Sequence, residues 1–73
     1  MPIERAKELL KNSDNSLEDL LNCLEQLSES RGYTKAAKKV GLYHSETAQE
    51  IITELEFYIE QITTRIKKLQ LTL

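Results

Sequence analysis

Residues 52–73, ITELEFYIEQITTRIKKLQLTL, decide the fold of this chain. Apolar side chains recur there at alternating intervals of three and four residues, the spacing that places side chains on one face of an α-helix. Neither proline nor glycine interrupts the stretch. The pattern predicts one long amphipathic C-terminal helix, from about 45 to 72, with a continuous apolar stripe. The members of this apolar stripe are Ile52, Leu55, Ile59, Ile62, Ile66, Leu69 and Leu73.

The apolar stripe is longer than the helix expected to cover it. A helix of about 26 residues is roughly 40 Å long, and the helix expected at 17–30 is about half that length. A chain of 73 residues is also near the lower size at which one core suffices for folding. We therefore expect a homodimer or a higher homo-oligomer through helix–helix packing. Its predicted interface is Ile52, Leu55, Ile59, Ile62, Ile66 and Leu69.

Shorter helical segments precede the long one. Pro2 suits the first turn of a helix over 3–11, and polar residues 12–15 favour a turn. Ser16 is a candidate N-cap for a helix over 17–30, which Gly32 is expected to end. Thr34 then begins a short helix over 35–40, ended by Gly41, before the last helix at 46–71. These segments predict a single all-α domain, 1–73, built as a small bundle of three or four helices.

Composition narrows the class of protein. Charged residues make up 30% of the chain, with two glycines and one proline, as is typical of helix bundles. The net charge of −2 offers no global attraction for nucleic acid or an anionic membrane. No apolar run approaches the roughly 20 residues that cross a bilayer. A single cysteine, Cys23, disfavours a secreted disulfide scaffold. We expect a cytoplasmic protein without membrane contact.

Groups that could carry chemistry are few. His44, the only histidine, belongs to a turn, and Cys23 flanks the apolar face of its helix. A nucleophile paired with a base would need an orienting group and an oxyanion site, which nothing in the sequence suggests. A di-metal carboxylate bundle would need a Glu-x-x-His pair, which does not occur. The sequence predicts no enzyme activity, no cofactor and no metal site.

Charge is segregated along the second half of the chain. Residues 31–39 hold four basic side chains and no acid, whereas residues 41–64 hold five glutamates and no Lys or Arg. Segregated charge can set the choice of partner. The sequence favours a non-enzymatic protein–protein interaction module, acting as a small adaptor, inhibitor or regulator. Side chains away from the apolar stripe form either a solvated face or a partner surface: Glu50, Glu54, Phe57 and Glu60.

One segment resembles a known motif. Residues 34–42, TKAAKKVGL, resemble the first half of a bacterial helix-turn-helix, with Ala37 and Gly41 at the matching spacing. The second half departs from the pattern, because Thr47 and Glu50 occupy positions where it has apolar residues. The resemblance implies an alternative function, a dimeric DNA-binding transcriptional regulator, with nucleic acid the less favoured partner. Its expected phosphate contacts are Arg31, Lys35, Lys38 and Lys39.

Overall fold

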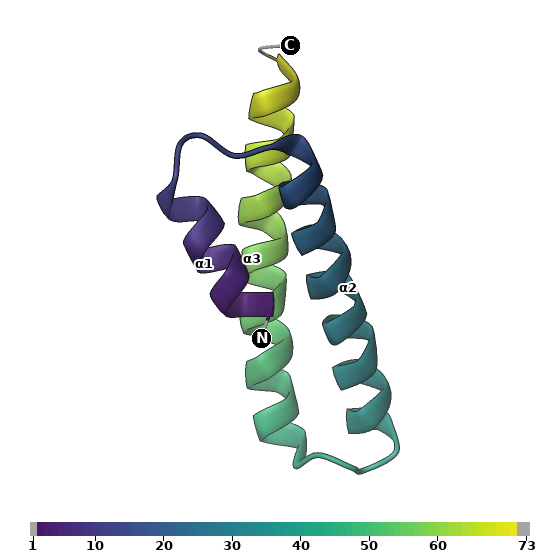
Figure 1. Cartoon of the computed structure of the whole chain (residues 1–73). Coiled ribbons are helices and arrows are strands. Elements are labelled where there is room, and N and C mark those ends of the chain that lie inside the picture. The colour runs from purple at the N-terminus through teal and green to yellow at the C-terminus, as the bar shows by residue number, and fades with distance from the viewer. Residues whose placement is uncertain (1, 72–73) are drawn as a thin grey trace.

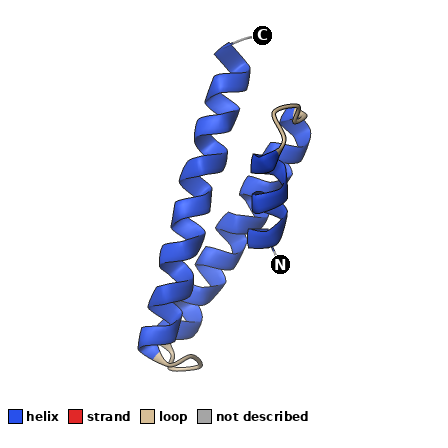
Figure 2. Ribbon diagram, turned by 90° about the vertical axis from the view of Figure 1, so that its left-hand side faces the viewer, coloured by secondary structure: helices blue, strands red, loops and turns tan. Residues whose placement is uncertain are grey.

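The computed structural model describes residues 2–71, in which every regular element is a helix and no strand occurs. Helix α1 spans Pro2–Lys11, α2 spans Leu17–Lys39 and α3 spans Ser45–Leu71. Helices α2 and α3 form a long antiparallel hairpin, and α1 lies against the half that contains the C-terminal end of α3 (Figures 1 and 2). The molecule measures 44 × 17 × 15 Å. The predicted all-α class is confirmed. Thr72 and Leu73, the end of the predicted apolar stripe, lie outside the described residues.

The second helix differs from its prediction. It continues through Gly32 and Thr34 to Lys39, so the predicted stop at 30 and the separate helix at 35–40 are wrong. Thr34 and Ala37 are buried and extend the face that begins with Leu20 and Leu27. The Thr34 hydroxyl donates to the Ser30 carbonyl at 2.7 Å, a bond made inside a helix rather than at its start. Packing against α3 therefore outweighs the local preference of Gly32 and Thr34 for ending one helix and starting another.

The predicted stop at Gly41 is confirmed in detail. Gly41 has a φ of 78°, and its N–H donates to the Lys38 carbonyl at 3.2 Å. The Leu42 N–H donates to the Ala37 carbonyl at 2.9 Å. These two bonds form a Schellman motif, in which a left-handed residue closes the helix. The chain then turns and begins α3 within a few residues.

The two glycines are expected to respond oppositely to substitution by alanine. A Cβ on Gly32 would meet nothing within 4 Å, so Gly32→Ala should stabilise the chain by about 0.5–1 kcal/mol. Gly41→Ala should destabilise it by about 1–2 kcal/mol, because its left-handed backbone disfavours a side chain. Urea unfolding of the two variants measures both changes. Changes of the same sign would contradict the assigned end of α2.

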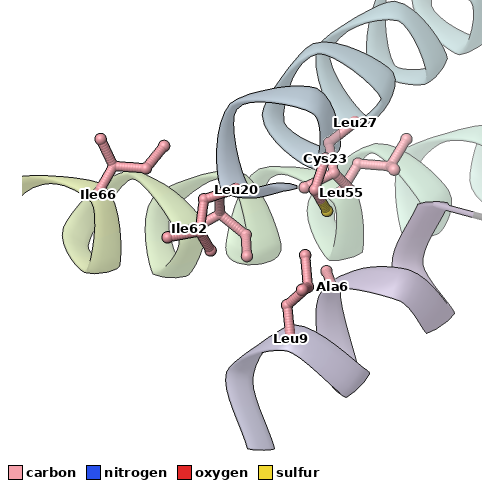
Figure 3. Close-up of a cluster of buried hydrophobic side chains, with 8 residues drawn as sticks. All are labelled: Ala6, Leu9, Leu20, Cys23, Leu27, Leu55, Ile62 and Ile66. Atoms are coloured by element: carbon pink, nitrogen blue, oxygen red, sulfur yellow. The ribbon is translucent and has the colours of Figure 1, made fainter. Parts of the chain in front are cut away.

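The core lies where all three helices meet. Ala6 and Leu9 of α1, Leu20 and Leu27 of α2, and Ile62 of α3 point toward one another (Figure 3). Leu20, Leu27 and Ile62 are fully buried, so their apolar surface supplies much of the folding free energy. The other members of this cluster are Cys23, Leu55 and Ile66.

Arg65 ties the end of α1 to α3. Its guanidinium donates to the carbonyl of Asn12 at 2.7 Å, to Oδ1 of Asn15 at 2.6 Å and to the carbonyl of Leu10 at 3.2 Å. The last carbonyls of a helix lack partners within it, so a cation placed there both neutralises and anchors the helix end. The loop between α1 and α2 is thereby fixed against α3.

Candidate functional site

The predicted oligomer interface lies largely inside the single chain. Ile52, Leu55, Ile62 and Ile66 are buried within the folded chain, and Ile59 and Leu69 are half-buried beside the core cluster. The prediction assumed that α2 is half the length of α3, whereas α2 has 23 residues and α3 has 27. The longer α2 covers the stripe within one molecule. Ile52, Leu55, Ile62 and Ile66 are core residues of the folded chain and offer almost no surface to a second copy, whereas Ile59 and Leu69 keep part of their surface exposed.

The opposite side of α3 remains open to solvent. A shallow depression of about 670 Å³ lies along its first half, lined by carboxylates, uncharged polar groups and two aromatic rings. Phe57 is 54% exposed at this place, although a phenylalanine ordinarily favours burial. We call this surface the outer face of α3. It consists of Glu46, Gln49, Glu50, Thr53, Glu54, Phe57 and Tyr58.

The outer face contains most of the predicted partner surface. Glu50, Glu54 and Phe57 line the same depression, whereas Glu60 is exposed but does not line it. The prediction missed Glu46, Gln49, Thr53 and Tyr58. Helical spacing from Phe57 back to Glu46 could have found the first three. No local signal assigns Tyr58 to this face, because it also packs against the core.

The two aromatic rings hold one another in place. The Phe57 and Tyr58 ring centroids are 5.1 Å apart, with planes inclined at 87°. This edge-to-face arrangement is a favourable geometry for aromatic pairs. Tyr58 is itself half-buried against the core cluster. Phe57 is therefore both exposed and restrained, which lowers the entropy lost when a partner contacts it.

Charge is divided between the inner and outer sides of the hairpin. Glu56 faces α2, where its Oε2 lies 2.7 Å from Arg31 Nε and 3.9 Å from Lys35 Nζ. Lys38 Nζ donates to Gln49 Oε1 at 2.8 Å. The basic end of α2 thus meets α3 within one molecule. Within residues 2–71, the carboxylates left without an ion pair on the outer face are Glu46, Glu50 and Glu54.

The structure places the segment that resembles a helix-turn-helix within a long antiparallel hairpin. Residues 35–39 are the last turn and a half of α2, and α2 runs antiparallel beside α3 (Figure 1). A helix-turn-helix instead needs two helices that cross at a large angle and leave the second free to enter the major groove. Of the four expected phosphate contacts, Arg31 and Lys35 are paired with Glu56. Lys38 bonds Gln49, and Lys39 is exposed at the end of α2.

A second group of exposed apolar side chains lies at the closed end of the hairpin. Tyr33 and Tyr43 make an edge contact with centroids 6.4 Å apart. Val40 and Leu42 are each more than two thirds exposed. Sequence reasoning did not predict an exposed apolar surface here, because helix 35–40 was expected to be separate. These four residues surround the Schellman motif and give this end of the molecule an apolar surface.

The remaining chemical groups have structural settings. Cys23 is buried under the first turn of α1, with its Sγ 4.0 Å from the Pro2 carbonyl. Burial raises the pKa of the Cys23 thiol above its ordinary value of 9.0, against a smaller lowering by the nearby Arg5 charge. His44 is exposed in the turn before α3. Among residues 2–71, no three His, Cys, Asp or Glu side chains are grouped so that they could hold a metal ion.

Searches for similar proteins give no assignment. No family model, no curated protein and no solved structure matches this chain. None of the helices in the described part of the chain combines the length and apolar character needed to cross a membrane. A functional interpretation therefore has to come from the surfaces of the molecule itself.

Proposed function

We propose that this chain is a non-enzymatic protein–protein interaction module, a small adaptor, inhibitor or regulator that binds its partner through the outer face of α3. The observation that carries the proposal is Phe57, which is exposed yet restrained at one end of a surface lined by carboxylates. Exposed aromatic residues in restrained positions are typical anchors of protein interfaces. The surface is shallow and built on one helix, so it fits a protein better than a small molecule, which a pocket would enclose.

Self-association through the apolar stripe is not part of this proposal. A contact between copies through Ile62 or Ile66 would require α1 or α2 to leave the core, because both side chains are buried. The outer face needs no such rearrangement. It is available in the folded chain. It differs in both charge and exposure from the inner face, which is the side of α3 that carries the buried apolar stripe.

Site-specific photo-cross-linking in the native host tests the proposal. Benzoylphenylalanine replaces Phe57 in one variant and Leu21 in a matched control, since Leu21 is 47% exposed but lies on α2. We expect a discrete protein adduct from position 57 that position 21 does not give. Equal adducts at the two positions, or none at position 57, would contradict the proposal.

A further inference from the structure

We propose that the outer face of α3 receives a cationic amphipathic helix of another protein. This inference rests on the proposed function and specifies the chemical class of the partner. Three properties of the surface carry it: its shape along one helix, the sign of its charge, and the position of its exposed aromatic ring.

The shape fits a helix lying alongside α3. The lining residues from Glu46 to Tyr58 follow helical spacing along about 18 Å of the axis. All of them belong to α3, so the depression has no wall from a second element. A long, shallow surface of this kind suits an amphipathic helix, whose apolar side chains recur every three or four residues. An extended peptide would instead need a sheet edge, and residues 2–71 contain no strand.

The charge selects a cationic partner. Glu46, Glu50 and Glu54 are spaced four residues apart, so their carboxylates follow one another at about 6 Å along one face. No Lys or Arg occurs between residues 41 and 64 to neutralise them from within α3. The nearby cations Arg31 and Lys35 are held by Glu56, which faces α2, and Lys38 bonds the uncharged Gln49 at the edge of the outer face. A partner with Lys or Arg on the flanks of its apolar face matches this arrangement.

Phe57 supplies the apolar contact. It follows Glu50 by two turns and Glu54 by one, so its ring continues the line of carboxylates rather than lying apart from it. The edge contact with Tyr58 fixes the ring before binding. A leucine or phenylalanine of the partner helix can pack against this ring while the flanking cations reach the carboxylates. Apolar and ionic contacts are then made together, which distinguishes an amphipathic helix from a disordered polycation.

A binding assay with defined peptides tests the proposal. The probe is a fluorescein-labelled peptide of about 15 residues, roughly four helical turns, with leucines on one face and lysines on the other. Its control has the same composition in an order that gives no apolar face. Fluorescence anisotropy with the full chain is expected to show binding at least about tenfold tighter for the amphipathic peptide, since the apolar contact needs a continuous face.

Charge reversal on the chain gives a matched comparison. Glu50→Lys with Glu54→Lys should weaken binding at least about tenfold, through the loss and inversion of two ion pairs. Glu25→Lys with Glu29→Lys makes the same change of net charge at the same spacing on the exposed side of α2. This control variant should bind the peptide less than about threefold more weakly than the unchanged chain, because the substituted residues lie outside the outer face of α3. A peptide with glutamates in place of lysines should bind the first variant better than the unchanged chain.

In the binding and sedimentation experiments, three results would overturn the inference. They are equal binding of the two lysine peptides, equal loss in the two charge-reversal variants, and a dimer of the chain that Glu50→Lys with Glu54→Lys dissociates in sedimentation velocity. The last would identify a second copy as the occupant. A cross-link from position 57 to an anionic segment would overturn the inference and leave the proposed function standing. If no peptide binds and position 57 gives no adduct, both the inference and the proposed function are overturned.

Discussion

Ile62→Ala is expected to lower the free energy of unfolding by about 2–5 kcal/mol, the range for truncating a buried Leu, Ile or Met side chain. Ile62 is fully buried at the junction of the three helices, beside Leu20 of α2 and Leu9 of α1. The truncation therefore removes contacts to every element of the fold at once. A domain of this size has a total stability of roughly 4–11 kcal/mol, so a large share would be lost. Urea unfolding followed by circular dichroism measures the change.

The matched control for this prediction is Leu21→Ala. Leu21 is 47% exposed on α2 and is not a member of the core cluster. Its truncation is expected to change the free energy of unfolding by less than about 0.5 kcal/mol. If Ile62→Ala and Leu21→Ala had similar effects, the inner face of α3 would not be the core of a single chain. An interface between copies would then become the better account of the apolar stripe.

Arg65→Ala is expected to expose Cys23 by loosening α1. The variant loses three hydrogen bonds that hold the last turn of α1 and the following loop. Loss of about 1–2 kcal/mol of docking free energy would raise the population of the open state, and the rate of thiol labelling, by about 5–30-fold. The thiolate is the reactive form, and burial raises the pKa of the thiol above 9.0 in the closed state. Opening thus increases both access and ionisation.

Labelling with a thiol reagent near pH 8 measures this effect. Lys67→Ala, an exposed cation two residues away, removes the same charge without touching α1 and should label as slowly as the unchanged chain. The raised pKa also gives a pH dependence. In the closed state, α1 covers Cys23. The stabilisation of this state by the neutral thiol is fully present below pH 9 and is lost as the pH rises through the thiol pKa of the folded chain. Equal labelling of Arg65→Ala and Lys67→Ala would contradict the anchoring role of Arg65.

The sequence predicted the first and last helices well because the patterns that indicate them are continuous. An uninterrupted apolar period specified α3, and Ile52, Leu55, Ile62 and Ile66 are buried on the face it indicated. Proline at the start and a polar turn at the end bracketed α1. In both cases propensity, periodicity and packing agree, which is the condition under which local reasoning succeeds.

The middle of the chain was mispredicted because local and tertiary preferences disagree there. Gly32 and Thr34 resemble the end of one helix and the start of another, yet both lie inside α2. The decisive contribution is the burial of Thr34 and Ala37, as α2 continues beside α3. This error had a consequence, because a short α2 left the apolar stripe without cover and led to an expected interface between copies. The wrong stop near Gly32 is thus the source of that expectation, while the oligomeric state itself stays a prediction.

Long-range contacts were not predictable in the same way. Arg65 is 50 residues from Asn15, and nothing in the local sequence of either indicates their hydrogen bond. The outer face of α3 was easier, because Glu50, Glu54 and Phe57 fall away from the apolar stripe by helical spacing alone. What the sequence could not predict is the restraint of the exposed Phe57 by Tyr58. Exposure and restraint together distinguish a candidate partner surface from an ordinary solvated face.

We propose that the two faces of α3 have separate roles, the inner face in folding and the outer face in binding. Two variants, Phe57→Ala and Ile62→Val, test this division. For each we measure the free energy of unfolding and the recovery of the partner protein that was first identified by cross-linking from position 57. We predict that Phe57→Ala changes stability by less than about 0.5 kcal/mol and loses the partner. Ile62→Val should lose about 0.5–1.5 kcal/mol and keep the partner. A Phe57→Ala chain that retains the partner, or an Ile62→Val chain that folds but loses it, would contradict the claim.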